Sequence, residues 1–464
     1  MMSRSLLLSA AALALTFSPT APAAALRAGA ARLDITPPSD PANPPSGKFA
    51  HERLYVRAIV LESGGTRAVL IGADQSGLSA AVVAAAAKTI AAELNCPSAN
   101  IVMSATHSHS AWGPGARPGP PSAAPLDPNQ PPPPIVGQLI QVVRQANANL
   151  QPARAGFGTG LSYLNVNRDS IDPQTHLWTQ APNLNAPSDK TVAVLKFETP
   201  AGDPIAVYMT YAMHPVNGYL SGLTSADFPG AASRHIEQAY DDKIVAVFAQ
   251  SASGDQNPLY LRAATNAMAS RSGAKITGNV LTRETIEAPL RDGKVSERPL
   301  APKVAETLER VMESEGVLLA EEVIRVMSNI TRTESAPRIA AATTTVTCPG
   351  RRRTDTVREG APGTYVDGDP VNIGLGLIRI GNVALTWVNA EIYSAIAQRL
   401  KQQSPLANTF MVTIANGRAN SGYIPDDASF GANSFQVLSS RLKPGCAETA
   451  IVGGLLDLIH ASNQ

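Results

Sequence analysis

Short apolar strands alternate with helical stretches along this 464-residue chain, and this alternation restricts the fold more than any other feature. Helices that follow strands in this way cover the faces of sheets, so the pattern predicts a mixed-sheet α/β sandwich. Strands are expected over 54–62, 67–72, 100–104, 190–198, 205–211, 243–249 and 409–415, with two more within 371–388 around Ile380-Gly-Asn. Helices are expected over 78–94, 135–150, 229–240 and 302–328, and another is expected to open at Glu391.

The first 25 residues have the pattern of a secretory signal peptide. Arg4 precedes a short apolar run over 6–17, and the small residues A-P-A-A-A follow over 21–25. The apolar run is too short to span a bilayer, and no later stretch is long and apolar enough for a transmembrane helix. We therefore expect an exported protein, periplasmic or secreted, that starts near Ala24 or Leu26; the alternative is a buried N-terminal helix.

Charge argues against a nucleic-acid partner. The chain has 38 Lys and Arg against 37 Asp and Glu, so it lacks the basic field that attracts phosphate backbones.

Cysteine usage allows one disulfide bond and one free thiol in an oxidising compartment. Cys348 and Cys446 are the favoured pair, because each lies beside proline and glycine in a loop-like context (T-C-P-G and K-P-G-C), which leaves Cys96 free. No Cys-x-x-Cys pattern is present, which argues against a thiolate metal site.

Four expected strands end in polar residues, at the place where open α/β sheets bind ligands. The strand N-I-V-M-S leads into A-T-H-S-H with His107 and His109, and the others lead into His214, the run Q-S-A-S-G-D-Q-N-P, and Glu391. If the first strand continued, His107 and His109 would share one face. Two histidines and a glutamate form a familiar zinc set with one position open for water. Histidines at strand ends also serve as structural hydrogen-bonding residues, so the residues alone leave both roles open.

Several segments resemble the neutral ceramidase family, and they occur in that family's order from about residue 27 to about 460. The paired-histidine stretch A-T-H-S-H-S-x-x-G-P-G is similar to the family's Thr-His-Thr-His-Ser-Gly-Pro-Gly signature. The other similar segments are A-R-L-D-I-T-P over 31–37, the Leu-x-x-Arg-Ala-type segment over 54–60, N-V-N-R-D-S over 165–170, G-D-Q-N-P over 254–258 and N-G-R-A-N-S-G-Y-I-P over 416–425.

The resemblance implies a neutral ceramidase-like zinc hydrolase domain over 26–464 and a set of site residues. The implied zinc ligands are His107, His214, Glu391 and Tyr423. It further implies that His109 is a polar neighbour of the reacting centre and that Arg168 is the site arginine. The chain also departs from the family pattern. Asn389-Ala390 replaces Pro-Gly before Glu391, Asn257 stands at the position of a family serine, and the family's C-terminal immunoglobulin-like domain is expected to be absent.

The resemblance implies an exported, zinc-dependent, ceramidase-like hydrolase of amide bonds whose substrate is an N-acyl lipid or a related N-acyl compound. His109 would relay a proton to the leaving amine, and Arg168 or the Asn257 amide would stabilise the oxyanion. Without the resemblance, Arg168 can equally be a surface or salt-bridged arginine, and Asn257 a turn residue before Pro258. Two alternatives stay open: a metal-retaining binding protein without activity, and a zinc hydrolase of esters or of short polar amides.

Overall fold

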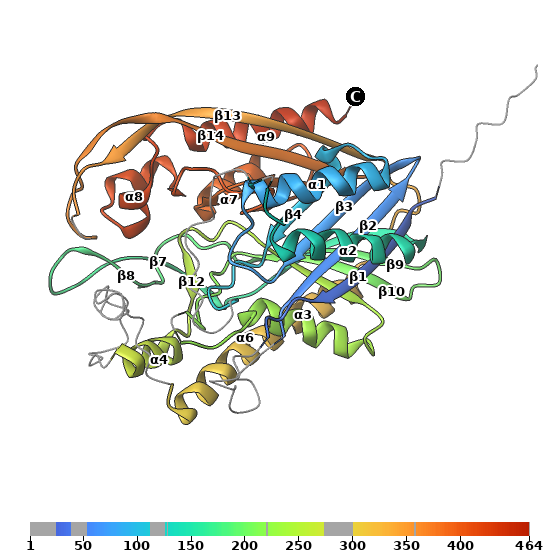
Figure 1. Cartoon of the computed structure of the whole chain (residues 1–464). Coiled ribbons are helices and arrows are strands. Elements are labelled where there is room, and N and C mark those ends of the chain that lie inside the picture. The colour runs from blue at the N-terminus through green and yellow to red at the C-terminus, as the bar shows by residue number, and fades with distance from the viewer. Residues whose placement is uncertain are drawn as a thin grey trace, which may run out of the picture.

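The computed structural model describes residues 25–38, 53–111, 126–127, 129–219, 221–272, 300–356 and 359–463 (Figure 1). The signal peptide expected over 1–25 lies outside these ranges except for its last residue. Within them, no helix combines the length and the apolar character that crossing a membrane requires.

The N-terminal sheet has the strand order β4-β3-β2-β1-β5. Two helices cover one of its faces, because their buried valines, leucines and alanines pack against the strands' apolar residues. The elements are β1 (Arg27–Asp34), β2 (Tyr55–Ser63), β3 (Thr66–Ala73), β4 (Ile101–Ala105) and β5 (Gln151–Pro152), with α1 (Ala80–Leu94), α2 (Pro134–Ala148) and the short η1 (Ser98–Asn100).

A second sheet, in the order β11-β10-β9-β6, is covered by two helices of the middle of the chain. Its elements are β6 (Arg154–Leu161), β9 (Thr191–Glu198), β10 (Pro204–Tyr211), β11 (Val245–Gln250), α3 (Asp227–Ala239) and α6 (Pro302–Asn329). The small sheet β12-β7-β8 adjoins it and consists of β7 (Asn165–Ile171), β8 (Trp178–Asn183) and β12 (Gln256–Pro258). Helix α4 (Arg262–Ser272) packs against α6.

The C-terminal sheet has the order β13-β14-β15-β17, and helices α7 and α9 cover it. The elements are β13 (Ile339–Arg353), β14 (Tyr365–Ile380), β15 (Val383–Val388), β17 (Asn408–Val412), α7 (Ser394–Gln403) and α9 (Ala447–Ala461). A two-stranded sheet of β16 (Glu391–Ile392) and β18 (Tyr423–Ile424), the short η2 (Asp427–Gly431) and α8 (Phe435–Ser439) complete this part.

One apolar core joins the three larger sheets. Leu70 of the first, Tyr208 of the second and Phe410 of the third belong to the same buried cluster. Each of these sheets also contains one parallel pair, namely β3 with β4, β10 with β11, and β15 with β17. The sandwich of mixed sheets predicted from the sequence is therefore confirmed.

The expected helix at Glu391 is wrong. Glu391 and Ile392 form strand β16, and α7 begins at Ser394. The reason is tertiary, because Glu391 pairs in parallel register with Tyr423, 32 positions further along the chain. Strand β17 also ends earlier than expected, at Val412, since Ile414 and Asn416 adopt left-handed backbone angles with φ of 53° and 55°.

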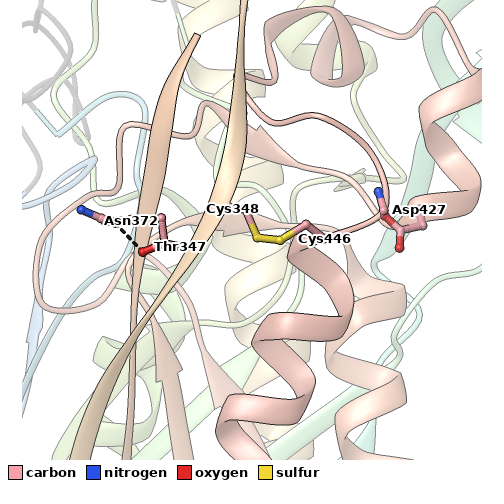
Figure 2. The surroundings of a disulfide bond; sticks show 6 residues. Thr347, Cys348, Asn372, Asp427 and Cys446 are labelled. Atoms are coloured by element: carbon pink, nitrogen blue, oxygen red, sulfur yellow. Dashed lines mark hydrogen bonds between the residues drawn. A yellow bond between two sulfur atoms is a disulfide. The ribbon is translucent and has the colours of Figure 1, made fainter. Parts of the chain in front are cut away.

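The favoured disulfide pairing is confirmed. Figure 2 shows Cys348 on β13 joined to Cys446, which directly precedes α9. Cys96 is free and buried. The bond links positions 98 residues apart and so ties the last helix to the edge strand of the C-terminal sheet.

We expect the double variant Cys348→Ser/Cys446→Ser to lose about 2–5 kcal/mol of unfolding free energy, because a cross-link across so long a loop restricts the unfolded chain strongly. Chemical denaturation of the variant and the parent protein measures the difference. Cys96→Ala is the control, since it removes a buried thiol and keeps the disulfide. A double variant as stable as this control would contradict the prediction.

Candidate metal centre

Three side chains from distant parts of the chain direct one donor atom each toward the same point. Glu391 Oε2 lies 3.5 Å from His107 Nε2 and 3.5 Å from His214 Nε2. All three residues are at most 4% exposed. In the part of the chain that the structure describes, His214 Nε2 and Glu391 Oε2 have no hydrogen-bond partner. Buried polar atoms without partners are costly, so the arrangement calls for a cation.

The second nitrogen of each histidine is held by a backbone carbonyl. His107 Nδ1 lies 2.6 Å from Ser76 O, and His214 Nδ1 lies 2.7 Å from Ser253 O. With the proton on Nδ1 donated to the carbonyl, each Nε2 presents its lone pair to the centre. This is the usual arrangement around metal-ligating histidines, in which an outer hydrogen bond sets the tautomer and the ring orientation.

The donor spacing fits zinc. In a tetrahedral zinc site with bonds of about 2.0–2.1 Å, neighbouring donor atoms lie about 3.3–3.4 Å apart. The 3.5 Å separations of Glu391 from both histidines are close to this edge length. The residues present therefore fit the metal.

These three side chains lie at the ends of strands. His107 follows β4, but the strand ends at Ala105, and His107 has a left-handed φ of 66°. The expectation that a continuing strand would align His107 with His109 is therefore wrong, and a turn brings the two together instead. His214 follows β10, and Glu391 opens β16 beyond β15.

Tyr423 lies beside this group through its pairing with Glu391. The two residues are register partners in the β16–β18 sheet, and the Tyr423 ring centre is 6.3 Å from that of His214. Burial, together with the Glu391 carboxylate, raises the pKa of Tyr423 to about 12. A bound cation would lower it again, because it stabilises the phenolate.

His109 lies next to His107 and His214, within reach of the same point. Its Nε2 is 3.3 Å from His107 Nε2, and the donor nitrogens of His107, His109 and His214 all lie within 4.8 Å of one another. Burial, followed by the two neighbouring histidines, holds the pKa of His109 well below its usual range. His109 is therefore neutral near pH 7.

Arg168 and Asn257 contact each other, and Arg168 lies beside Tyr423. Arg168 Nη1 donates to Asn257 Oδ1 at 3.4 Å, and the Arg168 guanidinium carbon lies 5.3 Å from the centre of the Tyr423 ring. Both residues are nearly buried, on the paired strands β7 and β12. Arg168 is therefore buried, and it makes no salt bridge with a carboxylate in the part of the chain that the structure describes. Asn257 lies in a strand instead of a turn.

Buried hydrogen bonds hold Arg168 and Glu391 to one backbone segment. Arg168 Nη2 donates to Gly254 O at 2.6 Å, and Gly254 N donates to Ile392 O at 2.8 Å. The Asp255 carboxylate accepts from Ser394 N at 2.8 Å, directly beyond Glu391 and Ile392. Burial raises the pKa of Asp255 to about 7. The segment 254–257 therefore connects the strand of Glu391 with Arg168 and Asn257.

The sequence interpretation missed Arg418, which donates from Nη2 to Glu391 Oε1. It also missed the two carbonyls that orient the histidines, because backbone acceptors carry no residue signature. Burial raises the pKa of Glu391, but His107 and Arg418 outweigh it, so the pKa lies well below its usual range and the group is a carboxylate. Burial, assisted by Arg168, lowers the pKa of His214 to about 4, which keeps its imidazole neutral.

Comparison with known proteins agrees with this architecture. The model of the neutral/alkaline non-lysosomal ceramidase N-terminal region matches residues 43–353. A solved ceramidase complexed with C2 is 16% identical, with a TM-score of 0.66, over 95% of this chain and 75% of that one. The neutral ceramidase from Pseudomonas aeruginosa is 17% identical, with a TM-score of 0.65, over 95% of this chain and 74% of that one. At this identity the solved structures establish the shared fold, and the family model, which spans more than half of the sequence, establishes that this chain belongs to the neutral/alkaline non-lysosomal ceramidase family.

Proposed function

We propose that this protein is an exported zinc-dependent hydrolase of amide bonds, with residues 26–464 as its hydrolase domain and an N-acyl lipid or a related N-acyl compound as its substrate. The observation that carries the proposal is the convergence of His107, His214 and Glu391 on one point, with two of their donor atoms buried and without a hydrogen-bond partner among the described residues. Tyr423 is the fourth ligand in this proposal. Bound zinc would polarise the amide carbonyl and lower the pKa of a water molecule to about 7.

The protein's own groups would provide the proton transfer. An amide is cleaved only when its leaving nitrogen receives a proton, which calls for a general acid close to the reacting carbon. His109 would meet this need once it has taken a proton, because its Nε2 lies 3.3 Å from His107 Nε2, a proposed ligand nitrogen. It would take a proton from the attacking water and pass it to the amine.

Arg168 and Asn257 would stabilise the negative charge that develops on the carbonyl oxygen. The Asn257 amide oxygen faces Arg168, which orients the Asn257 NH₂ group as a donor. Donors fixed before the reaction need no reorganisation as the charge develops, which makes them effective in a dry site. The burial of both side chains supports this role.

A substrate panel tests the proposal. Zinc-loaded protein is assayed against N-acyl amides with acyl chains from two to eighteen carbons, against the corresponding esters, and against short polar amides. We expect turnover of the N-acyl amides, with His109→Ala retaining zinc while losing activity by about 10²–10⁴-fold. Preference for esters or short polar amides would favour the hydrolase alternative, and zinc binding without any turnover would favour the binding protein.

If the protein is exported, its N-terminal segment should be removed. The mature protein should lack about the first 23–25 residues, because a small-residue cleavage site follows a short apolar run. Intact-mass analysis of protein recovered from the periplasm or the medium measures the start. Recovery there of protein that retains Met1 would contradict this part of the proposal.

A further inference from the structure

Arg418 holds one oxygen of the glutamate ligand. Its Nη2 donates to Glu391 Oε1, while Oε2 of the same carboxylate faces His107 and His214 at 3.5 Å. The Arg418 side chain is 31% exposed and Glu391 is 3% exposed, so the pair joins a half-exposed cation to a buried anion. The two carboxylate oxygens thus have different partners: one is charge-paired, and the other is directed at the metal position.

The backbone that brings Arg418 to this place is unusual. Ile414, Asn416 and Gly417 all have left-handed φ values, of 53°, 55° and 105°. A β-branched residue such as Ile414 adopts this conformation only at a cost of about 1–3 kcal/mol, and such strain persists where surrounding contacts impose it.

The contacts that impose this conformation come from the strand that precedes His107. Asn416 Oδ1 accepts from Met103 N at 2.8 Å, and Asn416 Nδ2 donates to Ile101 O at 2.9 Å. Ile414 N donates to Ala390 O, directly before Glu391. The strained segment 414–417 therefore ties the His107 strand to the Glu391 strand and fixes the place from which Arg418 reaches the carboxylate.

We propose that Arg418 is a positioning residue that keeps Glu391 a one-oxygen ligand and thereby fixes the coordination number of the metal. The inference rests on the proposed zinc function. Without the guanidinium, Oε1 would be free to rotate toward the cation as a second donor from the same carboxylate, because carboxylates bind metals in either mode. Arg418 also carries a fixed charge that restrains the carboxylate through a charge-assisted hydrogen bond.

Cobalt substitution tests the inference without an activity assay, because the visible absorption of Co²⁺ weakens as its coordination number rises. The full protein, freed of metal, is titrated with Co²⁺, and the visible spectrum and the dissociation constant are recorded. We expect Arg418→Met to weaken the visible absorption and to bind Co²⁺ about 10–100-fold less tightly, the usual effect of losing an outer partner of a metal ligand. Arg418→Lys keeps the charge and should restore part of both signals.

Arg67→Met is the matched control, since Arg67 makes a 2.7 Å ion pair with Glu62 at a similar side-chain exposure of 30%, on the opposite end of its strand from the site. Arg67→Met should show the same visible spectrum and the same Co²⁺ dissociation constant as the parent protein. If the parent protein binds no Co²⁺ at this site, the proposed zinc function fails. If the parent binds and Arg418→Met gives an unchanged spectrum with affinity within about threefold, the inference about Arg418 is overturned. Should Arg418→Met fail to fold, Arg418→Ala also removes the guanidinium, and a parent-like spectrum and affinity in that variant would overturn the inference equally.

Discussion

His107→Ala should leave the purified protein nearly free of zinc, whereas the parent protein should carry about one zinc per chain. The substitution removes one of four proposed donors, and the three that remain, from His214, Glu391 and Tyr423, leave the site one protein ligand short. Loss of a direct ligand should cost more than the 10–100-fold in affinity that an outer partner contributes. Glu391→Gln should have a similar effect, because it removes the negative charge between the two imidazoles.

Metal analysis by mass spectrometry measures the zinc content of these variants, and circular dichroism checks that they fold. His235→Ala is the control, because His235 bonds to Glu321 on the outside of the molecule at 2.7 Å and should leave the zinc content unchanged. Metal-free parent protein that turns over substrate at the full rate would show that the centre has another purpose.

The second large effect is expected at Asn257. Asn257→Ala should fold and keep its zinc but lose about 10²–10³-fold in kcat, the usual result of removing one oxyanion donor. Asn257→Ser should retain part of the activity, because a hydroxyl can also donate. Steady-state kinetics with the best substrate of the panel measures both, and Asn372→Ala, which alters an exposed amide bonded to Thr347, should behave as the parent (Figure 2).

Asn257 also bears on whether the reaction passes through an acyl-enzyme. An amide nitrogen is no nucleophile, because its lone pair is delocalised, so Asn257 cannot form an acyl-enzyme. Water should therefore attack the substrate directly, and rapid-mixing experiments should show no burst of released amine. A trapped acyl adduct on any side chain, or full activity in Asn257→Ala, would be incompatible with this assignment.

Most of the strands and helices, and part of the site, could be predicted from local sequence patterns. Strands β4, β10 and β15 could be predicted from their apolar runs. Polar residues follow each run, at the sheet edge where ligands bind in α/β folds. His107 and His214 could be proposed as ligands on this basis, because a strand end is a local feature. The cysteine pairing was predictable from the proline and glycine beside each residue together with the small number of candidates.

Only the folded chain decided how these parts meet. The sequence suggested a helix starting at Glu391. Its two-residue strand has no local signal, because it forms only by pairing with Tyr423 and Ile424. Likewise, nothing in the sequence near Asn416 points to Ile101 and Met103, more than 300 positions earlier, or indicates that Arg418 lies on a ligand carboxylate. Residue patterns report local periodicity and burial, whereas these contacts depend on which distant strand ends the apolar core brings to the same edge.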